Sequence, residues 1–137
     1  MTPRLVLDAW AVLAFLQKEE PAASRVKQLL TAAKENNVQL FISIINLGEV
    51  IYRIGKVKGE AQAQETLETI YLLPLQIISA DDEIVFAAVR FKMQYAISYA
   101  DAFAAALSER LEAVLVTGDP ELLNLKHQIQ LEPLERY

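Results

Sequence analysis

Four acidic residues differ from the other acids of the chain because each lies where a secondary-structure element is predicted to begin or end. Asp8 closes a short apolar run, and Asp119 follows another such run after a Thr-Gly turn. Glu49 falls in the second turn of a predicted helix, and Asp101 in the first turn of another. Two carboxylates ~5 Å apart repel by roughly 3 kcal/mol at an effective dielectric of about 20, so four together would need a cation. One or two divalent cations would remove this repulsion, activate water and orient a phosphate for in-line displacement.

The composition narrows the choice of metal. The chain has 137 residues, no Cys and one His, His127. Thiolate zinc sites, iron–sulfur clusters, a Cys nucleophile and any site with two imidazoles are therefore excluded. Oxygen ligands favour Mg²⁺ or Mn²⁺. The net charge is −5, so nucleic acid would be bound only through a local cationic patch or through the metal.

Short apolar runs alternate with longer helical patterns. We predict strands at 5–7, 38–42, 75–78 and 113–116, with 128–131 as the candidate for a fifth, edge strand. We predict helices at 9–17, 21–35, 44–57 and 59–72, one capped by Ser79 or Asp81 that reaches about residue 95, one capped by Ser98, and one turn after Pro120. This pattern predicts one α/β domain over 1–137, with helices on both faces of a short, mainly parallel sheet. Ligands of such sheets bind beyond the carboxyl ends of the strands, where the four acids can converge.

Each of these acids also has a structural role available to it. Asp8 and Asp119 stand where a helix N-cap is expected, and Glu49 can pair with Arg53 four residues later. Asp101 has a capping-box spacing from Ser98 and lies near the positive end of its helix, so we expect it to stay ionised. A cap can also be a metal ligand.

The same residues resemble the motifs of PIN-domain ribonucleases, specifically the VapC-type toxins of prokaryotic toxin–antitoxin pairs. The resemblance covers the whole chain. It depends on Leu7-Asp8, on Ser43-x5-Glu49, on Ile97-Ser98-Tyr99-Ala100-Asp101-Ala102 and on Val116-Thr117-Gly118-Asp119.

This resemblance implies a three-layer α/β/α sandwich of PIN type, Mg- or Mn-dependent cleavage of RNA, a homodimer, and an antitoxin partner that blocks the site. It also implies that Asp8, Glu49, Asp101 and Asp119 form the catalytic, metal-binding quartet, and that Thr117 supports it. One departure is that Ala9 and Trp10 stand where the family usually has a small hydroxyl residue.

Further residues have supporting interpretations. Ser98 could assist the site but is more simply a helix cap. Arg53, Lys56 and Lys58 could bind flanking phosphates of RNA. Trp10 and Phe15 are predicted to be core residues. The helix at 44–57 offers a candidate apolar groove for a partner helix.

The leading hypothesis is a metal-dependent endoribonuclease, and the toxin of a type II toxin–antitoxin system. The alternative is a PIN-fold module that binds protein or RNA without catalysis, which only the Ala9 and Trp10 departure supports. A phosphoryl-transfer domain is disfavoured, since a dehalogenase-type phosphatase would have a second Asp where Trp10 stands. No signal peptide or membrane span is recognised, so we expect a cytoplasmic protein with no membrane partner.

Overall fold

The structure, a computed structural model, describes residues 2–136, in which five parallel strands form one sheet of order β3-β2-β1-β4-β5. The strands are β1 (Arg4–Leu7), β2 (Gln39–Ser43), β3 (Gln76–Ile78), β4 (Val114–Thr117) and β5 (Leu131–Pro133). The chain winds outward from β1 to β3 and then continues on the other side of β1 with β4 and β5. The winding direction therefore reverses between β1 and β4, which is where open α/β sheets bind ligands. The predicted α/β class with a parallel sheet is confirmed.

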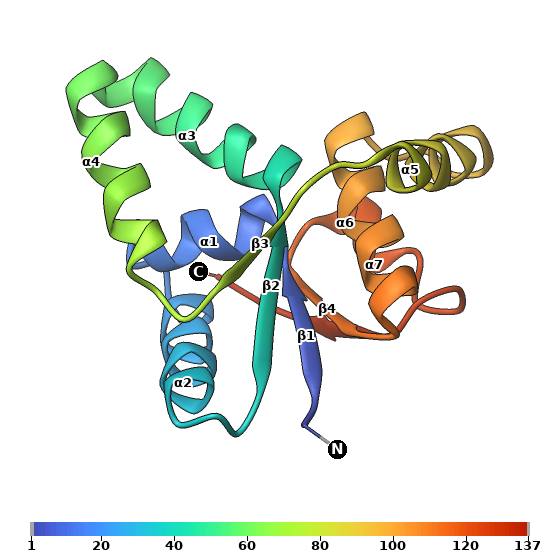
Figure 1. The fold of residues 1–137 in the computed structure, drawn as a ribbon, viewed down its shortest axis with the longest axis horizontal. Helices are drawn as coiled ribbons and strands as arrows, with labels where there is room; N and C mark the ends of the chain where they lie inside the picture. The colour runs from blue at the N-terminus through green and yellow to red at the C-terminus, as the bar shows by residue number, and fades with distance from the viewer. Residues whose placement is uncertain (1, 137) are drawn as a thin grey trace.

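Helices lie on both sides of this sheet (Figure 1). They are α1 (Ala9–Leu16), α2 (Ala22–Lys34), α3 (Ile44–Lys58), α4 (Glu60–Tyr71), α5 (Asp82–Gln94), α6 (Tyr99–Leu111) and α7 (Pro120–Leu123). Buried residues of α1 to α4 pack on one face of the sheet, and those of α5 to α7 pack on the other. In Figure 1, α3 and α4 form an arm at the upper left that extends beyond the sheet.

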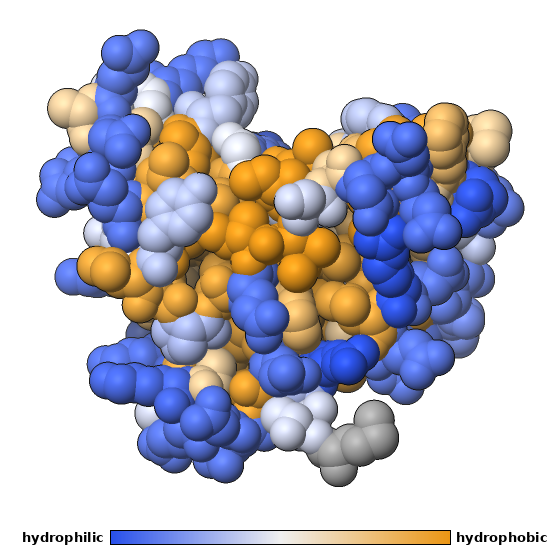
Figure 2. Space-filling model, in the orientation of Figure 1, coloured by the Kyte–Doolittle hydropathy of each residue, from blue (hydrophilic) through white to orange (hydrophobic). Residues whose placement is uncertain are grey.

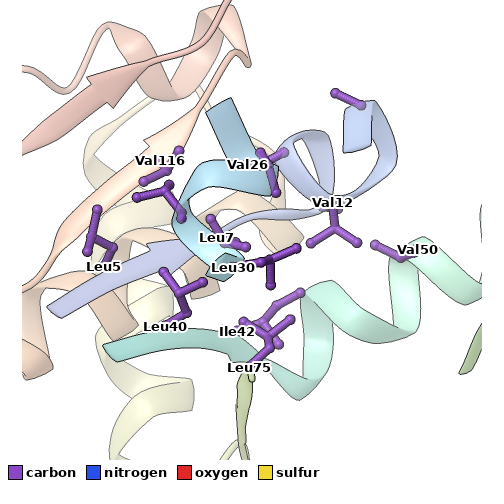
Figure 3. Packing of buried hydrophobic residues seen from close by; sticks show 14 of the residues in the cluster. Leu5, Leu7, Val12, Val26, Leu30, Leu40, Ile42, Val50, Leu75 and Val116 are labelled. Atoms are coloured by element: carbon purple, nitrogen blue, oxygen red, sulfur yellow. The ribbon is translucent and has the colours of Figure 1, made fainter. Parts of the chain in front are cut away.

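Alternation along the strands produces the two cores. In β1, Leu5 and Leu7 contribute to the core beneath α1 and α2, whereas Val6 contributes to the core beneath α6. In β2, Leu40 lies on the first side and Phe41 on the second. Successive side chains of a strand point to opposite faces, so strands buried on both sides have continuous apolar sequences. Figure 3 shows the first of these cores from close by.

The predicted fifth strand is wrong by three residues. The strand begins at Leu131 rather than at 128 and runs beside β4, with Thr117 opposite Pro133. Leu125 and Ile129 instead belong to the irregular segment after α7, where they pack into the core beneath α6. Residues 128–131 alternate polar and apolar side chains, and so short an alternation does not distinguish a loop that packs on the core from a strand.

Some apolar side chains remain at the surface. Figure 2 shows apolar surface in the hollow between the α3–α4 arm and α5. Large exposed apolar residues of these helices include Tyr52, Val57, Tyr71, Phe86 and Met93. Such patches are characteristic of surfaces that contact a partner. Among residues 2–136, none of the helices has both the length and the apolar composition needed to cross a bilayer.

Candidate metal centre

The sheet register brings Asp8 and Thr117 together. Leu7 of β1 lies opposite Val116 of β4, so Asp8, which follows β1, lies beside Thr117, the last residue of β4. The Thr117 hydroxyl donates a hydrogen bond to Asp8 Oδ2, and the backbone N–H of Ala11 donates to Asp8 Oδ1 at 2.8 Å. Asp8 is therefore the N-cap of α1, as predicted, and it is only 1% exposed.

Helix α3 places Glu49 over the same end of the sheet. The helix starts directly after β2, because Ser43 ends the strand and caps the helix. Arg53 Nη2 donates to Glu49 Oε2 at 3.0 Å, which is the predicted i,i+4 pair. The other carboxylate oxygen, Oε1, is buried and has no hydrogen-bond partner among the described residues. One oxygen of Glu49 thus remains available for a ligand.

Asp101 and Asp119 complete the group of acids. Ser98 caps α6 by accepting a hydrogen bond from the Asp101 N–H at 3.1 Å, as predicted. Asp119 caps the short helix α7, and its own N–H donates to the Thr117 hydroxyl at 3.0 Å. Carboxylate oxygens of Asp101, Asp119 and Glu121 all lie within 4.8 Å of one another. The loop after β4 therefore links Asp119 to Asp8 through Thr117.

Burial and mutual repulsion raise the pKa values of two of these acids. Burial raises the pKa of Asp8 to about 7, aided by the charges of Asp119 and Glu49 and opposed by the bonds from Thr117 and Ala11. Burial, followed by the charges of Asp119 and Asp8, raises the pKa of Asp101 to about 8. The expectation that Asp101 stays ionised is wrong for the protein without metal, because desolvation and neighbouring carboxylates outweigh the helix dipole. The charges of Asp119 and Glu49 act on Asp8, and those of Asp119 and Asp8 act on Asp101. Of the four sequence-predicted acids, Asp101 and Asp119 lie in the group whose oxygens are within 4.8 Å of one another, whereas Asp8 and Glu49 lie outside it.

A cleft of about 480 Å³ opens onto three of the four acids, and Asp8 is not among its lining residues. Glu49, Asp101 and Asp119 line it together with Arg53 and Lys56, so acids and cations face the same space. Its other lining residues are Ala9, Trp10, Leu13, Gln17, Tyr52, Val57 and Arg136. The predicted phosphate contact Lys58 lies elsewhere, in a neighbouring hollow between α3 and α4.

Several residues of this site were not anticipated from the sequence. Trp10 packs against the core beneath α1 and α2, as predicted, but it is only half-buried and also forms part of the cleft wall. Asn46 is fully buried one turn before Glu49, donates to Ala100 O at 3.0 Å, and leaves its Oδ1 without a partner among residues 2–136. A polar residue on the apolar face of a helix could have signalled Asn46, and the Asp-x-Glu spacing could have signalled Glu121. Arg136 gives no such signal, because only the tertiary fold brings it to the cleft.

The donor set fits a hard divalent cation. Every candidate ligand atom is a carboxylate oxygen, which Mg²⁺ and Mn²⁺ prefer. The oxygens of Asp101, Asp119 and Glu121 are clustered, and Glu49 Oε1 is buried without a partner in the part of the chain that the structure describes. In that same part, no Lys or Arg forms an ion pair with Asp8 or Asp101. A bound cation would supply the missing positive charge.

The sequence matches a known domain family. Residues 5–128 match the sequence model described as the PIN domain. No curated protein matches the chain.

Solved structures resemble the fold along nearly its whole length. The chain is similar to one in the crystal structure of VapBC2 from Rickettsia felis bound to a DNA fragment from its promoter, with TM-score 0.74, 23% identity, and coverage of 96% of this chain and 99% of that one. It is also similar to one in VapBC-1 from nontypeable Haemophilus influenzae, with TM-score 0.69, 22% identity, and coverage of 95% and 97%. VapC20 of Mycobacterium tuberculosis, a toxin that cleaves the sarcin–ricin loop, matches with TM-score 0.69, 12% identity, and coverage of 88% and 93%.

Proposed function

The chain belongs to the PIN domain family, and from that premise we propose that it is an endoribonuclease that depends on Mg²⁺ or Mn²⁺. We further propose that it acts as one PIN-like domain, in the cytoplasm, as the toxin of a type II toxin–antitoxin system. The similar VapBC structures, and VapC20 in particular, support this role. The catalytic and metal-binding residues of the proposal are Asp8, Glu49, Asp101 and Asp119.

One observation carries the proposal. Four carboxylates from four separate segments gather at the point where the sheet reverses its winding, and the pKa values of Asp8 and Asp101 rise to about 7 and about 8. Buried carboxylates that repel one another destabilise the folded protein when no cation is bound. Groups with such shifted pKa values are typical of functional sites. A divalent cation resolves the repulsion and gives the carboxylates a common function.

The cation, when bound, would activate water and stabilise the charge that develops on the phosphate during in-line displacement. Asp101 and Asp119 would hold it, and Glu121 lies within reach of the same position. Thr117 and the Ala11 N–H orient Asp8. Glu49 Oε1 has no partner among the described residues and is free to bind the cation or to accept a proton from water.

Cations in the cleft support an RNA substrate. Arg53 and Lys56 line the cleft beside the acids, and Arg136 lies at its other wall. In a chain of net charge −5, such a local group is what phosphate binding requires. We propose that Arg53 and Lys56 contact phosphates on either side of the cleaved bond, and that Lys58 does not.

Two exposed apolar surfaces, on α3 and on α5, are candidates for contact with protein partners. Tyr52 and Val57 of α3 are exposed and line the same cleft as Glu49. An antitoxin segment with an apolar helical face would cover them and block the acids beneath. The exposed Phe86 and Met93 of α5 offer a separate apolar surface for a second copy of the chain. Co-purification with the product of a neighbouring small open reading frame, and light scattering of the free chain, test these two partners.

The function is tested by incubating the purified chain with structured RNA in Mg²⁺, in Mn²⁺ and with a chelator. We expect cleavage with either metal and none with the chelator, with restoration by added Mn²⁺. Trp10 is the only Trp of the chain and lines the cleft, so bound paramagnetic Mn²⁺ should quench its fluorescence whereas Mg²⁺ should not. Cleavage that persists in the chelator would contradict the proposal. Metal binding and RNA binding without cleavage would favour the non-catalytic alternative.

A further inference from the structure

The contact between Trp10 and Gly118 is closer than any side chain at position 118 would allow. A Cβ atom built on Gly118 would lie 2.4 Å from Cη2 of the indole, 2.5 Å from Cζ2 and 2.6 Å from Cζ3. The six-membered ring of Trp10 therefore lies directly against the backbone of Gly118. A substitution there must displace either the ring or the loop.

Backbone conformation does not demand this glycine. Gly59 has a φ of +91°, in the left-handed region that favours glycine, whereas Gly118 does not lie in that region. A left-handed backbone is therefore not what requires a glycine at position 118. The indole of Trp10 is thus the steric reason for a glycine at this position.

The loop beneath the indole connects the site carboxylates. Thr117 donates to Asp8 through its hydroxyl and accepts the N–H of Asp119 on the same oxygen. On its other side, Leu134 N–H donates to Thr117 O at 2.8 Å, which continues the pairing of β5 with β4. The loop is therefore held by the C-terminal segment on one side and by Trp10 on the other.

The indole is itself held in place. Trp10 lies in the first turn of α1, two residues after Asp8. The guanidinium of Arg136 lies 5.0 Å from the centre of the ring, at a distance typical of a cation–π contact. Arg136 also pairs with Glu19 at 3.1 Å. The ring thus has little freedom to move away from Gly118.

We propose that Trp10 is a positioning residue for the metal centre: its indole lies on Gly118, fixes the Thr117–Asp119 loop, and so aligns Asp119 with Asp8 and Asp101. Within this loop, Thr117 donates its hydroxyl to Asp8. The inference depends on the proposed function, because it assigns Trp10 to the binding of the same cation.

The test compares Mn²⁺ binding by titration calorimetry in Gly118→Ala, Trp10→Ala and the double variant. Substitutions that disturb the support of metal ligands commonly weaken binding about 10- to 100-fold, so we expect Gly118→Ala to weaken Mn²⁺ binding by about 10-fold. Trp10→Ala should weaken Mn²⁺ binding less than Gly118→Ala does, and Trp10→Phe should bind Mn²⁺ like the wild type. The double variant should bind no more weakly than Trp10→Ala, because the new methyl group then occupies the space left by the indole.

A matched control separates this effect from a general cost of replacing glycine. A Cβ on Gly48, on the exposed side of α3, would meet no atom within 4 Å, so Gly48→Ala should bind Mn²⁺ like the wild type. In an Asp119→Asn background, Gly118→Ala should cost little more affinity, because the indole acts through Asp119. Thermal unfolding without metal would show which variants fold. If Trp10→Ala does not fold, the Mn²⁺ affinities of Gly118→Ala and Trp10→Phe test the proposal.

The inference is overturned if Gly118→Ala or Trp10→Ala binds Mn²⁺ like the wild type. It is also overturned if the fold-decrease in Mn²⁺ affinity of the double variant equals the product of the fold-decreases of the two single variants. A wild type that binds no Mn²⁺ would instead contradict the proposed function.

Discussion

Two groups of acids at helix starts have opposite electrostatics. Asp81 caps α5 by accepting the N–H of Ile84 at 2.9 Å, just as Asp8 caps α1 by accepting the N–H of Ala11 at 2.8 Å. Arg110 bonds to both oxygens of Asp81, at 3.1 and 2.9 Å, and holds the pKa of Asp81 below its usual value. Asp8 has other acids nearby and is buried, and its pKa rises to about 7.

The difference shows that an acidic cap is not informative by itself. Both caps satisfy a helix N-terminus, and the local sequence does not distinguish them. At Asp81 the protein supplies its own cation and leaves the group exposed to solvent. At the cleft the protein buries several carboxylates and, in the described residues, pairs only Glu49 with a cation. The first group is neutralised by Arg110, whereas Asp8 and Asp101 have no ion-pair partner among the described residues.

Catalysis should be the property most sensitive to the buried acids Asp8 and Asp101. We predict that Asp8→Asn or Asp101→Asn lowers the rate of RNA cleavage by at least about 100-fold, because each removes a charge that the cation requires. The measurement is cleavage of a labelled RNA in saturating Mn²⁺. Circular dichroism should show a folded protein in both cases, since the amide keeps the size of the side chain.

Asp82→Asn is the matched control for this prediction. Asp82 also lies in the first turn of a helix, but it is exposed and remote from the cleft lining. Its variant should cleave RNA at the wild-type rate. Full activity of Asp8→Asn and Asp101→Asn would contradict the assignment of the cleft as the active site.

The next effect is on stability without metal. The folded-state pKa values of Asp8 and Asp101, about 7 and about 8, exceed the unfolded value of 3.8. The folded protein therefore binds more protons than the unfolded chain between about pH 4 and pH 8, and its free energy of unfolding falls as pH rises through that range. Each group contributes a slope of up to about 1.4 kcal/mol per pH unit.

Urea unfolding in a chelator at pH 5.5, 6.5 and 7.5 would measure this slope. The pKa of Asp81 is lowered, so its contribution is present above its unfolded pKa and is lost only in more acidic solution. The Asp101→Asn variant should have a shallower slope, and saturating Mn²⁺ should abolish or reverse the slope in the wild type. A stability that rises with pH in the chelator would show that the acids are not held protonated.

The fold was predictable because each strand and helix has a recognisable pattern in its own short stretch of sequence. The alternation of short apolar runs with helical patterns gives the parallel sheet, and strand ends give the positions of Asp8 and Asp119. The fifth strand was misplaced because Ile129 is apolar but packs in a loop. Strand periodicity does not contain that information.

The approach of the four acids was also predictable, since parallel strands and the helices that follow them share one edge. That these acids bind a cation stays a prediction. Trp10 and Arg136 were not assigned to the cleft, because their positions depend on the C-terminal segment crossing to α1. The direction of the pKa shift at Asp101 was missed for a similar reason: burial is a property of the tertiary structure.

Asp81, which is paired with Arg110, should contribute little to stability. Asp81→Asn removes one charge from an exposed ion pair, and such pairs contribute little and are screened by salt. We predict that it lowers Tm in the chelator at pH 8 by less than about 4 °C, and that the decrease shrinks further at high salt. Asp101→Asn should raise Tm under the same conditions, because it removes a carboxylate that its neighbours repel. Differential scanning calorimetry of the two variants measures both changes. If both substitutions lowered Tm equally, the cleft acids would be as well compensated as Asp81, and the contrast between the two groups would be wrong.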